Sequence, residues 1–301
     1  MQVERSILTR AVSEALQEDI GEGDVTTCSV IPKGSMARAK VVAREDMVLC
    51  GMSFMEEAFM QVDGQIQWKP TAKDGMRLTG GATIAQVEGA AAGILTAERT
   101  ALNSLQRLSG VATLTRQFVD AIGRHSCKLL DTRKTTPGWR LFEKYAVACG
   151  GGTNHRMGLH DMVMIKDNHL ATLGPSAAQT IPLAIQQARA AYPHLRIEVE
   201  ADTLEQARYA IEAGADIILL DNMSPTQLAD AVKINQGRCV LEASGGITLA
   251  NVQAVAASGV DCISIGAVTH SVKAVDIAVS YTHLRAHETG RNLVCRLLLE
   301  K

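Results

Sequence analysis

The sequence predicts an α/β protein, with a (β/α) barrel in its second half and a separate α+β domain in its first. From about residue 127 onward, short apolar segments alternate with stretches of helical periodicity. The apolar segments are dense in Val, Ile and Leu, which is typical of parallel strands buried on both faces. Polar residues follow these segments, as they do at the mouth of a barrel. An open doubly wound sheet is the alternative, and the many polar strand ends favour the barrel.

The repeating half divides into strands and helices at identifiable residues. The expected strands are Cys127–Thr132, Met162–Ile165, Ile197–Val199, Asp216–Leu220, Cys239–Leu241 and Cys262–Ile265. The expected helices are Leu204–Ala213, Pro225–Asn235 and Leu249–Ala257, with N-caps at Thr203, Ser224 and Thr248 and stops at Gly214, Gly237 and Gly259.

The first hundred residues have a different pattern. Strands are expected at Ala37–Leu49, Ile66–Lys69 and Thr83–Glu88. Helical periodicity over Leu95–Leu108 predicts a helix that links the two parts. We therefore expect an N-terminal domain over residues 1–109, a barrel over residues 110–270, and a C-terminal segment, residues 271–301, that returns to the N-terminal domain.

Composition narrows the class of protein. The chain of 301 residues is 47% hydrophobic and 21% charged, which indicates a globular protein. The net charge of −2 gives no sign of nucleic-acid or membrane-surface binding, and no apolar run reaches the length of a membrane span. The polar N-terminus and the seven scattered cysteines predict a cytoplasmic protein whose cysteines are reduced and buried rather than bound in disulfides or to zinc.

Charged residues gather at the expected mouth. The cations are Arg133, Lys134, Arg156 and Lys166, and the acids include Asp131, Glu200, Asp202, Asp221 and Glu242. Glu200 and Asp221 end adjacent strands, so they are candidate ligands of Mg2+ or of ribose hydroxyls, a role that Glu198 could share. For Asp202 we expect only an ion pair with a mouth cation. Such a mouth suits a substrate with several negative charges and a divalent metal.

Glycines in the last two strand-to-helix connections predict a phosphate site. Ser244-Gly245-Gly246 precedes an expected helix, and Gly266 follows the next strand. Backbone N–H groups at such glycines can approach a phosphate, and barrels often bind phosphate after their last two strands. The alternative is that these glycines only form turns.

Lys166 and His155 each allow two interpretations. Lys166 could form a Schiff base or act as a charged anchor, and the neighbouring Asp167 favours the anchor because it opposes a lowered pKa. His155 and His160 could suggest zinc, but their spacing does not suit a shared helix face.

The ordered motifs resemble the quinolinate phosphoribosyltransferase family over roughly residues 5 to 279. They are Gly23-Asp24-Val25-Thr26-Thr27, Glu98-Arg99-Thr100-Ala101-Leu102-Asn103, Asp131-Thr132-Arg133-Lys134-Thr135, Gly150 to Arg156, Ile165-Lys166-Asp167-Asn168-His169, Glu198-Val199-Glu200, Leu220-Asp221-Asn222 and Glu242 to Ile247.

The resemblance implies an N-terminal α/β sandwich, an incomplete α/β barrel and a reaction. Quinolinate and phosphoribosyl pyrophosphate would give nicotinate mononucleotide, pyrophosphate and carbon dioxide, with Mg2+, in NAD biosynthesis. It implies that Arg133, Lys134, His155, Arg156 and Lys166 hold quinolinate and phosphate groups, with Glu200 and Asp221 near ribose and metal. Lys134, Lys166, Glu200 and Asp221 form the expected catalytic set, and Ser244, Gly245, Gly246 and Gly266 the phosphate cradle. Arg99 is expected to reach the site of a neighbouring subunit, in a homodimer or a higher oligomer.

The end of the chain departs from the family. The residues after about Ser280 lose the pattern, and we expect them to be foreign to the fold. His283 and His287 there indicate a solvated tail rather than a metal site. Three other functions stay open at this point: a related transferase acting on another anionic substrate, a Schiff-base aldolase using Lys166, and a sensor of sugar phosphates.

Overall fold

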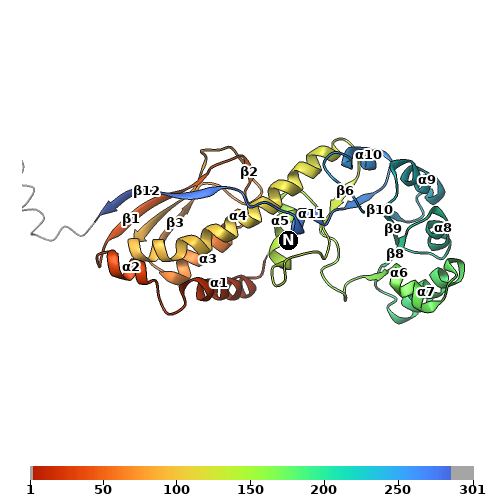
Figure 1. Cartoon of the computed structure of the whole chain (residues 1–301), viewed down its shortest axis with the longest axis horizontal. Helices are drawn as coiled ribbons and strands as arrows, with labels where there is room; N and C mark the ends of the chain where they lie inside the picture. The colour runs from red at the N-terminus through yellow and green to blue at the C-terminus, as the bar shows by residue number, and fades with distance from the viewer. Residues whose placement is uncertain (1–2, 286–301) are drawn as a thin grey trace, which may run out of the picture. The chain divides into compact units, whose positions relative to one another are not determined.

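The computed structural model describes residues 3–285, which form two compact units (Figure 1). The first holds the described residues of Met1–Thr113 and Lys273–Lys301, and the second is Leu114–Val272. The domain boundaries expected after residues 109 and 270 stay a prediction, because compactness alone does not show that a unit folds by itself.

The first unit is built on an antiparallel sheet with strand order β12-β1-β5-β3. The strands of this unit are β1 (Met36–Ala43), β2 (Met47–Val48), β3 (Gln67–Pro70), β4 (Arg77–Leu78), β5 (Thr83–Ala90) and β12 (Ile277–Arg285), of which β2 and β4 form a separate pair. Its helices are α1 (Arg5–Ile20), α2 (Val25–Val30), α3 (Met52–Val62) and the first part of α4 (Ala91–Ile122). Alternate residues of β1 are buried, so one sheet face is covered, and the expected α+β arrangement is confirmed.

Two expected elements of the first unit differ in length. The segment Ala37–Leu49 is not one strand, because the chain bends after Ala43 and Asp46 accepts a hydrogen bond from the Gly80 N–H at 3.0 Å. The helix expected at Leu95–Leu108 extends in both directions, since buried apolar residues such as Val111 and Phe118 continue its periodicity.

The second unit contains a six-stranded parallel sheet with order β6-β11-β10-β9-β8-β7. The strands are β6 (Lys128–Leu130), β7 (Val163–Ile165), β8 (Ile197–Ala201), β9 (Ile217–Asp221), β10 (Val240–Ser244) and β11 (Cys262–Ser264). The first of these strands pairs with the last, as in a barrel, which excludes the open doubly wound sheet. No pairing joins β6 to β7 within the described residues, so the barrel is incomplete, as expected.

Helices follow the barrel strands (Figure 1). They are α5 (Arg140–Cys149), α6 (Asp167–Leu173), α7 (Ala177–Ala191), α8 (Leu204–Glu212), α9 (Pro225–Asn235), α10 (Val252–Ala257) and α11 (Ala267–His270). Thr203 and Ser224 are N-caps with capping boxes, and Gly214, Gly237 and Gly259 follow helix ends with positive φ, as expected. Thr248 is not an N-cap, because its N–H donates to Asn251 Oδ1 at 2.7 Å in a turn and α10 begins only after Asn251.

The C-terminal segment joins the sheet of the first unit. Strand β12 runs antiparallel to β1 and pairs Ile277 with Ala43 and Tyr281 with Ala39. The pairing continues beyond Ser280, where we expected foreign sequence, and the origin of these residues stays a prediction. His287 lies outside the described residues.

Two findings concern membrane spans and the state of the cysteines. None of the helices in the part of the chain that the structure describes is both long enough and apolar enough to span a membrane. None of the six described cysteines is in a disulfide, although only Cys50 is buried and Cys28 is exposed, so the expectation of uniformly buried cysteines is wrong.

Candidate active site

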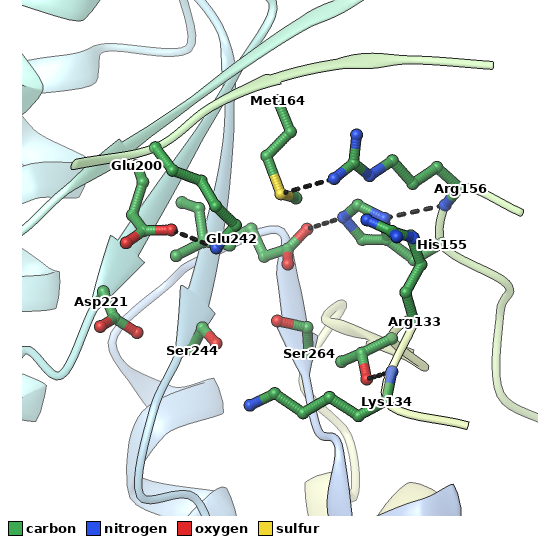
Figure 2. A pocket seen from close by; sticks show the side chains of 13 residues that line it. Arg133, Lys134, His155, Arg156, Met164, Glu200, Asp221, Glu242, Ser244 and Ser264 are labelled. Carbon is green, nitrogen blue, oxygen red and sulfur yellow. Dashed lines mark hydrogen bonds and ion pairs between the residues drawn. The ribbon is translucent and has the colours of Figure 1, made fainter. Parts of the chain in front are cut away.

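A cavity of about 430 Å³ opens at the carboxyl ends of the barrel strands and lies within the second unit (Figure 2). Its lining includes many of the residues that the sequence singled out: Arg133, Lys134, His155, Arg156, Lys166, Glu200, Asp221 and Ser244. Thr132, Met164, Leu219, Glu242 and Ser264 complete the lining. The small and apolar members carry no signal of their own in the sequence, because they become site residues only through their places at the strand ends.

Arg133 and Arg156 form the positive side of the cavity. Burial, and then repulsion by Arg133, lowers the pKa of Arg156. Arg156 donates to the Met162 carbonyl at 3.1 Å and lies 3.4 Å from the Met164 sulfur, and neither group is an anion. The buried Nε of Arg133 has no hydrogen-bond partner among the described residues. The pair therefore suits a ligand that brings negative charge, since Arg binds carboxylates well.

Lys166 is paired with an acid from the neighbouring strand. It is the N-cap of α6, directly after β7, and its Nζ donates to Glu200 Oε2 at 2.7 Å. The side chain of Glu200 is 12% exposed, so the pair is partly shielded from water. Because the Nζ is held by a carboxylate rather than free to attack a carbonyl, this contact supports the anchor interpretation over the Schiff base.

Three carboxylates meet at the ends of β8 and β9. Ligand oxygens of Glu200, Asp202 and Asp221 all lie within 4.8 Å of one another. Burial, and then the neighbouring acids, raises the pKa of both Asp202 and Asp221. Hard oxygen donors that repel one another in this way fit Mg2+, whose charge would relieve the repulsion.

Asp202 was expected only to pair with a cation of the mouth. Within residues 3–285, its carboxylate makes no ion pair, and it faces the acids Glu200 and Asp221 instead. The expectation is wrong, because Asp202 follows the end of β8 and lies beside Glu200 and Asp221.

His155 lies between two buried acids. Its Nε2 is 3.2 Å from Glu198 Oε2. The same nitrogen is 3.4 Å from Glu242 Oε2, the contact drawn in Figure 2. Burial disfavours the imidazolium, but the two carboxylates outweigh it and raise the pKa of His155 to about 10. The Arg156 N–H donates to Nδ1 of the ring at 2.8 Å, and the imidazolium would lose this bond, which opposes the increase.

Glu198 does not lie with Glu200 and Asp221, as the sequence suggested. The sequence suggested a role beside Glu200 and Asp221, because alternate residues of a strand face the same side. The side chain of Glu198 is fully buried, one layer deeper in the barrel, and contacts His155. His155 with Glu198 and Glu242 also offers three ligand atoms within 4.8 Å, but the His155 nitrogen is already directed at the carboxylates.

The expected phosphate cradle lies beside the cavity. Ser244 ends β10 and lines the cavity, whereas Gly245, Gly246 and Gly266 do not. A Cβ at Gly245 would lie 2.2 Å from Asn222 Oδ1, and one at Gly266 would lie 2.9 Å from Cδ of Lys134. Gly245 is therefore required, because its φ is +91° and the Asn222 backbone nitrogen would also lie 2.9 Å from the Cβ, whereas at Gly266 the flexible Lys134 side chain could move aside. The expected helix start near Thr248 is wrong, because α10 has only 6 residues and begins at Val252, so its N-terminus does not directly follow Gly246.

Two candidates lie away from the cavity lining. Asp131, expected at the mouth, is fully buried and paired with Lys144 on α5. Arg99 is an exposed residue of α4 in the first unit, so its expected role in a neighbouring site stays a prediction.

Comparisons with known proteins agree with these features. The model of the "Quinolinate phosphoribosyl transferase, C-terminal domain" matches residues 111–280, and that of the N-terminal domain matches residues 24–109. The "Probable nicotinate-nucleotide pyrophosphorylase (carboxylating)" of Bacillus subtilis (strain 168) is 44% identical over 276 residues, covering 91% of this chain and 93% of its own length. The nicotinate-nucleotide pyrophosphorylase (carboxylating) of Mycobacterium leprae is 42% identical over 277 residues, covering 89% and 95%. The solved nicotinate-nucleotide pyrophosphorylase of Francisella tularensis has a TM-score of 0.88 at 42% identity, covering 93% of this chain and 98% of its own.

Proposed function

The chain belongs to the quinolinate phosphoribosyltransferase family, and from this premise we propose that it transfers a phosphoribosyl group to the ring nitrogen of quinolinate. The other substrate is phosphoribosyl pyrophosphate. The products are nicotinate mononucleotide, pyrophosphate and carbon dioxide, so the enzyme is a transferase of NAD biosynthesis. We expect it in the cytoplasm.

One observation carries this proposal. A single cavity of about 430 Å³ holds Arg133, Lys134, Arg156 and Lys166 together with Glu200 and Asp221. Cations on one side suit the two ring carboxylates of quinolinate. Acids on the other side suit the ribose hydroxyls and a divalent cation that accompanies pyrophosphate.

The chain's own residues would bind and orient rather than form a covalent bond to substrate. Arg133 and Arg156 would hold the ring carboxylates and direct the ring nitrogen toward C1 of the ribose, and the positive charge of His155 would add to the attraction. Lys134 and Lys166 would bind phosphate groups and the negative charge of the ring carboxylates. Orientation of two reactants can supply a large part of a rate enhancement, so no nucleophile–base pair is needed.

Magnesium fits the acid group of Glu200, Asp202 and Asp221. Glu200 and Asp221 are the ligands that we expect, and Asp202 is near enough to join them. When bound, the metal would stabilise the negative charge that develops on the departing pyrophosphate. Glu200 would then give up its contact with Lys166, which frees that ammonium for an anionic substrate group.

The remaining parts of the proposal concern phosphate binding and assembly. Ser244, Gly245, Gly246 and Gly266 would cradle the 5-phosphate of the ribose, next to Lys134. Arg99 would complete the site of a second subunit, so the active form would be a homodimer or a larger oligomer built from it.

The test is a product assay. The protein is incubated with quinolinate, phosphoribosyl pyrophosphate and MgCl2, and nicotinate mononucleotide and carbon dioxide are measured in equal amounts. Reactions with EDTA, or with nicotinate in place of quinolinate, serve as controls and should give little product. Turnover of nicotinate but not of quinolinate would contradict the proposal and favour a related transferase. Absence of any turnover, with sugar-phosphate binding retained, would favour the sensor.

A further inference from the structure

Helix α5 carries two fully buried charged side chains. Glu143 and Lys144 are both 0% exposed, although charged residues are rarely buried completely. A buried ion pair adds little stability compared with apolar residues of similar size, because both charges lose their water. Stability alone therefore does not account for these residues.

Lys144 and Asp131 bind the backbone of the segment that carries His155 and Arg156. The Lys144 ammonium donates to Asp131 Oδ1 and, at 3.0 Å, to the carbonyl oxygen of His155. Asp131 Oδ1 accepts a hydrogen bond from the His155 N–H at 2.8 Å. Both backbone polar groups of His155 are thus satisfied by one side-chain pair.

Asn154 ties this arrangement together. Its Nδ2 donates to Asp131 Oδ2 at 2.6 Å and to the Lys144 carbonyl oxygen at 2.8 Å. The carboxylate of Asp131 therefore receives hydrogen bonds from a backbone amide, a side-chain amide and an ammonium. A network in which each member has its partners is rigid, since breaking one contact leaves a buried polar group unsatisfied.

The place of this network in the barrel explains why it is needed. Thr153 makes two backbone hydrogen bonds to the β6 segment. Its N–H donates to the Leu129 carbonyl at 2.8 Å, and its carbonyl accepts from the Asp131 N–H at 3.2 Å. After Thr153 the strand-like pairing stops, at the position where the barrel is open between β6 and β7. Lys144 and Asp131 supply the hydrogen bonds that a neighbouring strand would have made.

Helix α5 also binds the loop that carries Arg133 and Lys134. Glu143 accepts hydrogen bonds from the Thr136 N–H at 3.0 Å and from the Thr136 hydroxyl at 2.8 Å. Arg140 donates to Thr135 Oγ1 and to the Met157 carbonyl oxygen, each at 3.0 Å. Arg133 and Lys134 immediately precede these threonines.

We propose that α5 positions the cations of the cavity: Lys144 with Asp131 fixes His155 and Arg156, and Glu143 fixes the loop of Arg133 and Lys134. The inference rests on the proposed function, because it assigns His155, Arg156 and Arg133 to the ring acid and Lys134 also to phosphate. Glu143, Lys144 and Asp131 are absent from the lining of the cavity, so they are positioning residues and not catalytic ones.

The test separates positioning from stability. Lys144→Met and Asp131→Asn should each raise KM for quinolinate about tenfold or more, because small displacements of binding groups are costly, while KM for phosphoribosyl pyrophosphate changes less than about twofold. Glu143→Gln should raise both KM values, because its loop carries Arg133 and the phosphate-binding Lys134. The control is Ile185→Ala on α7, where a buried apolar side chain is removed far from this network. It should lower Tm and leave both KM values unchanged. The same pattern for the α5 variants would overturn the proposal.

Two further variants make the test complete. In Lys144→Met combined with Asp131→Asn, KM should be no higher than in the worse single variant, because both residues act through one segment; multiplied effects would contradict this. Asn154→Ala removes only the amide contacts and should raise KM for quinolinate about threefold even if the charged variants do not fold. Wild-type protein that fails to turn over quinolinate contradicts the proposed function, whereas active wild type with unchanged KM in these variants contradicts the positioning role alone.

Discussion

Arg133 and Arg156 are the residues of the cavity whose positive charge a substrate would most effectively neutralise. Within residues 3–285 neither arginine forms an ion pair with an acid, although Glu198 and Asp161 favour the charged form of Arg156, and repulsion by Arg133 contributes to the lowered pKa of Arg156. Lys166, by contrast, already has Glu200 at 2.7 Å. A ligand with two carboxylates would therefore gain more from the arginines, and its binding would reorganise the Lys166 contact.

We expect Arg133→Ala or Lys166→Ala to lower kcat/KM about a hundredfold or more, which corresponds to about 3 kcal/mol, as the loss of charged contacts to substrate would. The measurement is steady-state kinetics with quinolinate varied at saturating phosphoribosyl pyrophosphate. Lys128→Ala is a matched control, because Lys128 is an exposed cation at the opposite end of β6. Near-normal kcat/KM in both site variants would show that the site has been assigned wrongly.

The acids around His155 give a prediction about protonation. Glu198 and Glu242 raise the pKa of His155 to about 10 by favouring the imidazolium. Glu242→Gln removes one of these charges, so the pKa of His155 should fall. The expected direction can be measured from the imidazole signals in an NMR titration of the ligand-free protein. Glu205→Gln, an exposed change on α8, should leave the His155 titration in place, and an unchanged pKa in Glu242→Gln would contradict the role of that acid.

At the scale of elements, the connection after β10 depends on one glycine. Gly245 has φ +91°, and a Cβ there would lie 2.2 Å from Asn222 Oδ1. Gly245→Ala should therefore displace the connection, weaken phosphate binding and raise KM for phosphoribosyl pyrophosphate about tenfold, with a loss of stability of about 1–3 kcal/mol. Both are measured on purified protein, by kinetics and by chemical denaturation.

Gly214→Ala is a control that introduces backbone strain without displacing the connection after β10. Gly214 has φ +80° and nothing within 4 Å of a Cβ, and it follows a helix away from the cavity. It should lower stability to a similar extent without changing either KM. If Gly245→Ala behaved in the same way, the connection would have no part in phosphate binding.

The elements differ in how far the sequence could predict them. Strands such as Asp216–Leu220 were located correctly because their apolar residues are buried on both faces, and the polar residues after them reach one mouth as a consequence of parallel pairing. The start of α10 was misplaced because Thr248 and Asn251 are both good caps, and the choice depends on the turn that they form.

The roles of α5 could not be predicted for a different reason. Glu143 and Lys144 have the local pattern of a solvated helix face, and nothing near them in sequence indicates burial. Asp131, the partner of Lys144, lies 13 residues away, and Thr136, the partner of Glu143, lies 7 residues away. These residues come into contact only when the barrel forms. Long-range contacts of this kind leave no periodic signal.

At the scale of the whole molecule, the cavity lies within the second unit and Arg99 within the first. Arg99 is an exposed residue of α4. In the homodimer that we propose, a second copy would bring its Arg99 to the site.

A mixing experiment tests this sharing of residues between subunits. Arg99→Ala and Lys166→Ala damage different parts of the proposed site, so each homodimer should be nearly inactive. In a mixed dimer, one site would contain both substitutions and the other would contain neither. With random mixing, half of the dimers are mixed and one of their two sites is intact, so activity should recover to about a quarter of the wild-type value. The two proteins are unfolded and refolded together, and activity is compared with that of separately refolded samples. If Arg99 acted within its own chain, every site would keep one defect, and mixing would restore nothing.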